Sequence, residues 1–325
     1  MEDQTFSNRV DLAGLQVAVN DIKTEVNKII VGQEEMVELL IASILANGHV
    51  LIEGVPGVAK TLTAKLLAKT LSVEFSRIQF TPDLMPSDII GTSIYNLKTS
   101  EFEFKKGPLF SNVILIDEIN RAPAKTQSAL FEAMEERQIT VDGKTYKLSP
   151  PFIVLATQNP VEQEGTYRLP EAQLDRFLVK IEVDYPSLEE ETKLLSEFHL
   201  RKNTVNIDVV NAIMNAAKVE EYRNAVSMIH IEQNLIAYIV KVVNQTRNAS
   251  SVYLGASPRA SLAVLAMAKA MAAMHGRDFV NPDDIKRVLP AVLKHRIILT
   301  PEKEMEGVTI KEVIKQLIEQ VEVPR

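Results

Sequence analysis

Residues 54 to 61 carry the spacing that most clearly suggests chemistry. They read Gly-Val-Pro-Gly-Val-Ala-Lys-Thr and lie between a short apolar run and a stretch of helical periodicity. In a phosphate-binding loop, G-x-x-x-x-G-K-[ST], backbone N–H groups at a helix N-terminus surround phosphate oxygens. The Lys60 ammonium would neutralise the β- and γ-phosphates, and the Thr61 hydroxyl would bind Mg²⁺. We expect nucleotide contacts from Gly54, Val55, Pro56, Gly57, Val58, Ala59, Lys60, Thr61 and Leu62.

One position departs from this pattern. Ala59 stands where the second glycine is expected. An alanine with a negative φ suits the start of a helix, so we expect the loop to form with that geometry. A positive φ would strain an alanine, because only glycine adopts it without steric cost.

A second motif adds the chemistry of hydrolysis. The apolar run 113–116 is followed by two carboxylates, Asp117 and Glu118. At the C-terminal end of a parallel strand, Asp117 would lie beside the phosphates and hold Mg²⁺ through water. Glu118 would lie on the other side of the pleat and polarise the attacking water. The intact pair favours an enzyme over a protein that only binds nucleotide.

The first half of the chain alternates strand-like and helix-like segments. Continuous apolar strands separated by helices predict a parallel sheet covered on both faces. Two further segments, 89–107 and 138–148, predict β-hairpins, the second because Asp142-Gly143 is a type I′ turn signal. The expected strands are 50–53, 76–80, 113–116, 152–156 and 177–181, and the expected helices between them include 61–71 and 124–136.

After Pro186 the pattern becomes helical. Ser187, with Glu190 three residues later, is the expected N-cap of the first helix. We predict an α/β nucleotide-binding domain over residues 1–186 and an all-helical domain, without strands, over 187–325. The predicted helices are 188–200, 207–217, 228–247, 257–275, 281–297 and 309–321.

Composition excludes several other classes. The absence of cysteine rules out disulfides, thiol nucleophiles and thiolate metal sites, and the five histidines show no metal-binding spacing. Residues 1–186 have a net charge of −8 and residues 187–325 of +1, without a Lys/Arg run, which counts against a broad nucleic-acid interface. The polar N-terminus predicts no secretory signal, and the apolar stretch 260–274 is too short to span a bilayer. We expect a cytoplasmic protein.

Together these motifs resemble the AAA+ ATPases, and longer matching sequence segments narrow the resemblance to the MoxR group. It extends from about residue 10 to 320, and alanine at position 59 is familiar in that group. The resemblance implies a five-stranded parallel P-loop sheet sandwiched by helices, followed by a smaller helical lid. The matching segments are residues 31–34, 117–123, 156–160, 169–177 and 255–259.

The resemblance also implies roles for single residues. Asn159 matches the sensor-1 position, where an amide orients the lytic water. Arg176 matches the arginine finger that reaches a neighbour's γ-phosphate, and Arg168 is a second candidate. Arg259 matches sensor 2, which would couple the lid to the nucleotide, while Val31 and Gly32 match the adenine-side segment.

The function implied is ATP hydrolysis with Mg²⁺ in a ring, expected to be a hexamer, that remodels, matures or activates protein complexes in a chaperone-like way. Its expected partner is a protein client, for which von Willebrand A-domain proteins are one possibility. In relatives the two inserts at 89–107 and 138–148 face the ring axis or the substrate, although both could be solvent hairpins here. Alternatives are a magnesium-chelatase-like ATPase subunit, a nucleic-acid-remodelling motor and a nucleotide-gated scaffold.

Overall fold

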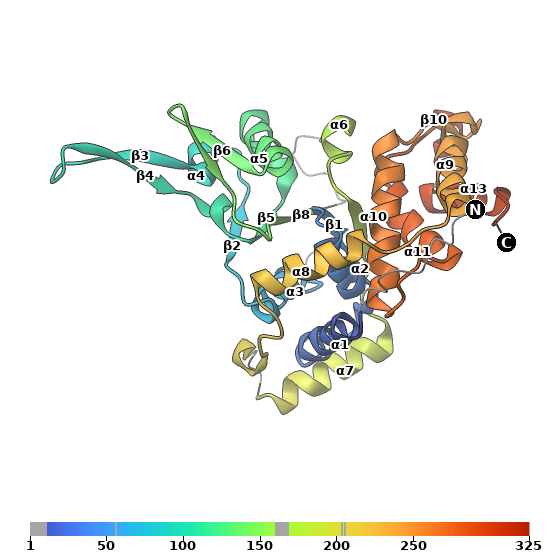
Figure 1. The fold of residues 1–325 in the computed structure, drawn as a ribbon, viewed down its shortest axis with the longest axis horizontal. Coiled ribbons are helices and arrows are strands. Elements are labelled where there is room, and N and C mark those ends of the chain that lie inside the picture. The colour runs from blue at the N-terminus through green and yellow to red at the C-terminus, as the bar shows by residue number, and fades with distance from the viewer. Residues whose placement is uncertain (1–11, 56, 160–168, 203, 205, 325) are drawn as a thin grey trace, which may run out of the picture.

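The computed structural model describes residues 12–55, 57–159, 169–202, 204 and 206–324. At its centre lies a five-stranded sheet in the order β2-β5-β8-β1-β9, with every neighbouring pair parallel (Figure 1). The predicted parallel sheet is confirmed, and each predicted run overlaps its strand. The strands are β1 (Val50–Gly54), β2 (Phe75–Gln79), β5 (Val113–Asp117), β8 (Ile153–Gln158) and β9 (Val179–Val183).

Alternate residues of each central strand enter two separate cores. Leu115 and Leu155 face a core with α1 (Ala13–Asn27), α2 (Glu34–Leu45) and α3 (Lys60–Thr70). Ile114 and Val154 face the opposite core, which includes α5 (Ala124–Glu136). Both faces of the sheet are therefore dry, which explains why its strands read as continuous apolar runs.

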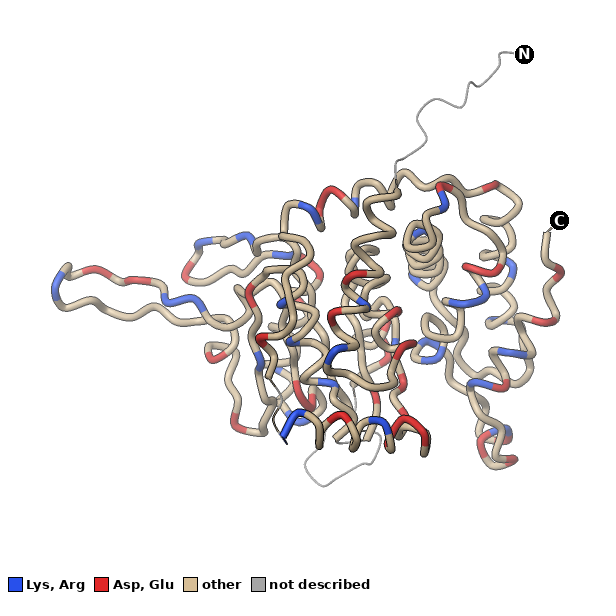
Figure 2. The backbone as a smooth tube through the Cα atoms, turned by 90° about the horizontal axis from the view of Figure 1, so that it is seen from below, with Lys and Arg blue, Asp and Glu red and all other residues tan. Residues whose placement is uncertain are grey.

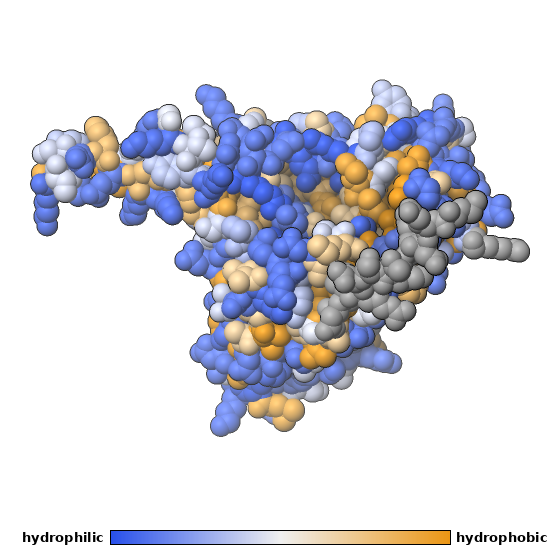
Figure 3. All heavy atoms as spheres, viewed as in Figure 1, coloured by the Kyte–Doolittle hydropathy of each residue, from blue (hydrophilic) through white to orange (hydrophobic). Residues whose placement is uncertain are grey.

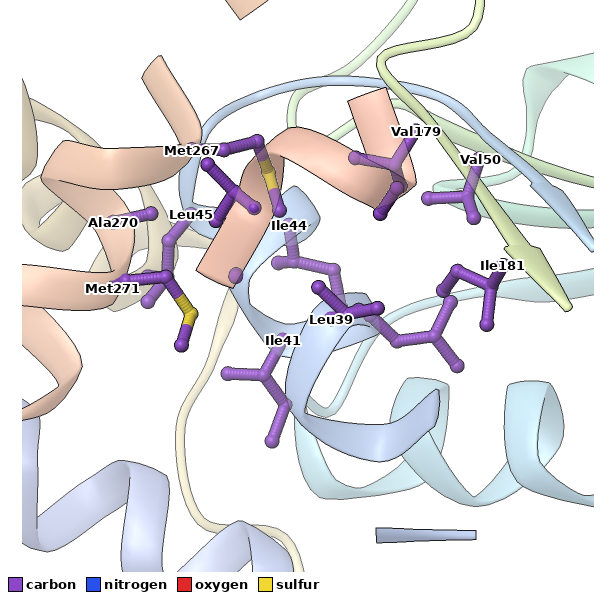
Figure 4. Close-up of a cluster of buried hydrophobic side chains, with 14 of the residues drawn as sticks. Leu39, Ile41, Ile44, Leu45, Val50, Val179, Ile181, Met267, Ala270 and Met271 are labelled. Atoms are coloured by element: carbon purple, nitrogen blue, oxygen red, sulfur yellow. The ribbon is translucent and has the colours of Figure 1, made fainter. Parts of the chain in front are cut away.

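The second half of the chain is helical, and its lid helices pack on the sheet domain through the first core. Figure 4 shows Met267, Ala270 and Met271 of α10 beside Ile44 and Leu45 of α2, with the strand residues Val50, Val179 and Ile181 on the other side of the same cluster. The predicted boundary at residue 186 stays a prediction, because the core is shared across it. The helices are α7 (Leu188–Leu200), α8 (Ala216–Ser227), α9 (Gln233–Asn248), α10 (Pro258–Met274), α11 (Pro282–Leu293), α12 (Pro301–Met305) and α13 (Ile310–Gln320).

Two details of this half differ from the prediction. A helix over 207–217 is wrong: a short 3₁₀ turn, η3 (Ile207–Val209), is followed by α8, which begins at Ala216. The Asn215 side chain accepts a hydrogen bond from the Lys218 N–H, and such an N-cap starts a helix at that point. The lid also contains an antiparallel pair, β10 (Val252–Leu254) and β11 (Ile298–Leu299), too short to show alternation.

Both predicted hairpins form. One pairs β3 (Gly91–Asn96) with β4 (Glu101–Lys106), and the other pairs β6 (Gln138–Val141) with β7 (Lys144–Lys147). The β3–β4 hairpin extends well beyond the body of the molecule (Figures 1 and 2). Phe104 at its base stacks on Tyr146 of the other hairpin, with ring centroids 4.7 Å apart. This contact ties the bases of the two hairpins together.

His49, which immediately precedes β1, is a buried polar link between the sheet and α5. Its Nδ1 accepts a hydrogen bond from the Val154 N–H at 3.0 Å, and its Nε2 lies 3.1 Å from the Met134 carbonyl oxygen. These partners require the neutral ring with the proton on Nε2, because a protonated Nδ1 would face the Val154 N–H. Burial lowers the pKa of His49 from 6.5 to about 4.

This burial predicts a loss of stability in mild acid. Between pH 6.5 and about 4, His49 binds a proton in the unfolded chain but not in the folded chain. The free energy of unfolding therefore falls as the pH falls. The full loss is about 3 kcal/mol for this one residue. Chemical unfolding of wild type and His49→Gln over that pH range measures it: the variant should show a shallower pH slope. The matched exposed variant His199→Gln should keep the wild-type slope, and an unchanged slope in His49→Gln would contradict the assignment.

Candidate active site

The phosphate-loop segment connects the carboxyl end of β1 to the N-terminus of α3, as predicted. Within the described part of this loop, Gly57 has a φ of +90° and Ala59 a φ of +57°. The expectation of a negative φ at Ala59 is therefore wrong, since α3 begins only at Lys60 and Ala59 is its left-handed N-cap. An L-residue pays a steric cost in this conformation. Pro56 lies outside the described residues.

Lys60 of the phosphate loop lies near several carboxylates of neighbouring segments. Its Nζ donates to the Gly54 carbonyl at 2.6 Å. Burial lowers the pKa of this ammonium, and the opposing charges of Asp117, Glu118 and Glu53 limit the decrease. The lysine therefore supplies a half-buried cation at the phosphate loop.

Asp117 ends β5 and is 8% exposed. Its Oδ2 accepts from the Arg77 Nε at 2.6 Å, and its Oδ1 accepts from the Thr157 hydroxyl at 3.2 Å. The same Thr157 oxygen accepts from the Glu118 N–H at 3.0 Å. Thr157 therefore fixes the turn that carries both carboxylates, and Arg77 balances the charge of Asp117.

Glu118 is held differently from Asp117. It has a φ of +58°, a strained conformation of the kind that clusters at functional sites. Its Oε2 accepts from the Gln79 Nε2 at 2.9 Å and pairs with the Arg121 Nε at 3.1 Å. Two side chains thus orient one oxygen of the carboxylate that we expect to polarise water.

These groups line one open cavity of about 390 Å³. The structure brings together the two motifs and Asn159, which follows β8. It also adds side chains that the sequence analysis missed, from β2 and β8. Arg77 and Gln79 are polar residues in a strand run, which usually indicates only an exposed edge. The lining consists of Gly54, Gly57, Val58, Ala59, Lys60, Thr61, Leu62, Arg77, Gln79, Asp117, Glu118, Thr157, Gln158 and Asn159.

Val31 and Gly32 lie at the same edge of the sheet without lining this cavity. The next residue, Gln33, donates to the carbonyl of Asp184, which follows β9. Val183 at the end of β9 is paired with Gly54 in the sheet. Their expected place beside the adenine therefore remains a prediction about an adjacent surface.

The two predicted arginines lie at the opposite edge of the sheet. Arg176 precedes β9, and its Nη1 is 2.6 Å from Glu135 Oε2 and donates to the Phe131 carbonyl at 2.9 Å. Arg259 lies 2.7 Å from the other oxygen of Glu135. Glu135 is in the last turn of α5, whose Met134 carbonyl contacts His49 just before β1. The alternative finger, Arg168, lies outside the described residues.

The donor set at the phosphate loop fits a cation held mainly by phosphate and water. Among the described residues, no group of three or more His, Cys, Asp or Glu side chains is arranged to hold a metal. Thr61 and Asp117 line the cavity beside Lys60, and Asp117 already carries a cationic partner in Arg77. Mg²⁺ in nucleotide sites is typically bound through few protein ligands plus phosphates, which agrees with this set.

Comparison with known proteins agrees with this geometry. Residues 49–179 match the family described as ATPases associated with various cellular activities (AAA), and residues 244–317 match the AAA lid domain. The chain is 48% identical to the uncharacterized protein YeaC of Bacillus subtilis over 92% of both chains. It is 44% identical to Chaperone MoxR1 of Mycobacterium tuberculosis, over 93% of this chain and 81% of that protein. A crystal structure of a candidate ATPase from Cytophaga hutchinsonii, 46% identical, has a TM-score of 0.89 and covers 97% of each chain.

The sheet, phosphate loop, paired carboxylates and helical lid define a P-loop ATPase of the AAA+ class, which binds and hydrolyses ATP. Within that class the chain belongs to the MoxR family. Within residues 12–55, 57–159, 169–202 and 206–324, each helix is too short or too polar to span a bilayer.

The left-handed Ala59 generates a stability prediction. Ala59→Gly should raise the free energy of unfolding by about 0.5–1 kcal/mol, because relief of the positive φ exceeds the added entropy of the unfolded chain. Thermal unfolding without nucleotide checks this, with Ala18→Gly inside α1 as the matched control. The control should lower stability by about 1 kcal/mol. A lower melting temperature for Ala59→Gly would contradict the assigned backbone conformation.

Proposed function

We propose that this chain hydrolyses ATP with Mg²⁺ in a ring of identical subunits, in which each site is completed by the neighbouring chain. One observation carries the proposal: the phosphate loop and the two arginines lie at opposite edges of one sheet. Parallel strands rise about 3.3 Å per residue, so the five residues of β9 separate the edges by about 16 Å. An arginine side chain does not cover that distance. Arg176 therefore acts on the nucleotide of another subunit.

Within one chain, each residue at the loop has a separate task. Lys60 and the loop N–H groups bind the phosphates, and Glu118 accepts a hydrogen bond from the attacking water and polarises it. Gln79 and Arg121 orient Glu118, and Asn159 lies where its amide can orient the same water. Thr61 and Asp117 would hold Mg²⁺, which would offset the negative charge of the phosphates.

When subunits assemble, the neighbouring chain brings its Arg176 guanidinium to the nucleotide. Arg176 would stabilise the charge that develops on the γ-phosphate, a role for which a permanently charged planar guanidinium is suited. Arg259 shares its position beside Glu135, so we assign Arg259 to the neighbour's nucleotide as well. This arrangement makes turnover depend on assembly, and a hexamer is the ring size that the family resemblance predicts.

Mixing two inactive variants tests the shared site. Lys60→Ala should lose ATP binding, and Arg176→Ala should bind ATP normally with kcat reduced at least a hundredfold. In mixed assemblies some interfaces join an intact loop to an intact arginine, so ATPase activity should partly recover, with a maximum at an intermediate ratio. No recovery at any ratio, although mass measurements show mixed assemblies, would mean that Arg176 acts within its own chain or only structurally.

We further propose that the protein remodels protein clients, as the name of the relative Chaperone MoxR1 suggests. The β3–β4 hairpin is suited to gripping a client, because Leu97 is 86% and Phe102 is 73% exposed near its tip. Figure 3 shows hydrophobic atoms among hydrophilic ones on this extension, and Figure 2 shows charges of both signs along it. Apolar side chains with mixed charge favour an exposed protein segment over a phosphate backbone. A von Willebrand A-domain client and a cytoplasmic location stay predictions.

A hairpin variant tests the client role with a defined probe. The change Leu97→Ser with Phe102→Ser should leave the basal ATPase rate within twofold of wild type. It should weaken binding of reduced, unfolded α-lactalbumin at least fivefold, measured by fluorescence anisotropy with ATP present. The control Lys98→Ser on the same hairpin should bind the probe as wild type does. Equal binding by the apolar variant would place the client surface elsewhere.

A further inference from the structure

Two arginines from different parts of the chain meet on one carboxylate. Glu135 Oε2 pairs with Arg176 at 2.6 Å, and Glu135 Oε1 pairs with Arg259 at 2.7 Å. Arg176 lies in the segment between α6 (Glu171–Leu174) and β9, whereas Arg259 lies in the first turn of lid helix α10. The three side chains line a shared pocket of about 210 Å³. One acidic group thus bridges the sheet domain and the lid.

The pair of guanidiniums needs such a group. Both side chains are permanently charged, and like charges in one pocket repel each other. His49, which lines the same pocket, is uncharged near neutral pH because burial lowers its pKa to about 4. Asp175 also lines it, but this carboxylate is engaged by Arg296, with its Oδ1 2.7 Å from the Arg296 Nε. Glu135 is therefore the acidic residue that contacts both Arg176 and Arg259.

The arrangement leaves part of each guanidinium for another anion. Arg176 uses Nη1 for both Glu135 and the Phe131 carbonyl, and the Phe131 ring lies 5.9 Å below its guanidinium carbon. Arg259 contacts Glu135 through Nη2. Each guanidinium carries five N–H donors, so anchoring at one edge is compatible with phosphate binding at another. A second contact of Asp175 supports the geometry, because its Oδ2 accepts from Ser257, the N-cap of the helix that carries Arg259.

Stability is a poor explanation for these ion pairs. The side chains of Glu135 and Arg259 are 39% and 50% exposed, and ion pairs as exposed as this one contribute little to the stability of a fold. A fixed position of the two arginines contributes more to catalysis than to stability, because a preorganised cation needs no reorganisation when charge develops in the transition state.

We propose that Glu135 is a positioning residue, which holds Arg176 and Arg259 together as one two-arginine site for the γ-phosphate of a neighbouring chain's nucleotide. The inference rests on the proposed trans role of Arg176. Removing the negative charge of Glu135 leaves two arginines that repel each other and lose their common anchor. The neighbour's turnover then falls, although the chain's own phosphate loop is intact.

The isosteric change Glu135→Gln tests this, with the exposed Glu132→Gln one turn earlier on α5 as the control. We expect kcat to fall about tenfold in Glu135→Gln and the KM for ATP to stay within twofold, because the loop that binds ATP is unaltered. The protein concentration for half-maximal ATP-dependent assembly, measured by mass photometry, should rise several-fold. Glu132→Gln should match wild type in all three quantities. Melting temperatures of both variants confirm that each is folded.

A triple variant, compared with its two-arginine parent, separates positioning from general structure. If Glu135 acts through the arginines, adding Glu135→Gln to Arg176→Ala with Arg259→Ala should cause no further loss of kcat, since coupled residues are non-additive. A further tenfold loss there, an unchanged kcat in Glu135→Gln, or a faster rate in that variant would each overturn the inference. Full activity in Arg176→Ala would instead contradict the proposed trans finger itself, so the two failures are distinguishable.

Discussion

The length of the β-strands separates the catalytic groups of this ATPase. Five residues of extended chain place the phosphate loop, Asp117 and Glu118 at one edge of the sheet, and Arg176 at the other. Because the strands are short, stiff and buried on both faces, neither group can move toward the other without breaking the core. If Arg176 acts on the nucleotide of another subunit, as proposed, each chain holds an incomplete site and needs a neighbour.

The packing of the lid gives this separation a second consequence. The core that covers one face of the sheet continues into α10, so the lid and the sheet domain share apolar contacts along with the polar links through Asp175 and Glu135. A phosphate that drew Arg259 toward a neighbouring subunit would act on α10, which packs on α1 and α2 of the sheet domain. On the proposed trans arrangement, we expect the nucleotide of one subunit to bias the lid of the next.

Sequence alone located the parts of the site whose chemistry is local. The loop before Lys60, the carboxylates at the end of β5 and the turn at Asp142-Gly143 are specified by neighbouring residues, and all three lie where predicted. Gln79, Arg77 and Glu135 could not be predicted, because their partners come from other strands and helices through tertiary packing. The predicted negative φ at Ala59 was wrong, because the loop imposes a positive φ that alanine alone does not favour. The predicted helix over 207–217 was wrong, because it rested on a helical pattern alone and Asn215 caps a helix that begins at Ala216.

If one chain cannot complete its own site, its ATPase activity must depend on assembly, which a single titration measures. The ATPase rate per subunit is measured against protein concentration, with molecular mass determined at each point, with and without ATP. A site shared between subunits predicts a rate per subunit that rises steeply as assemblies form and becomes constant once assembly is complete. A rate that is independent of concentration and is already maximal for the monomer would contradict it, and would leave Arg176 without a catalytic role.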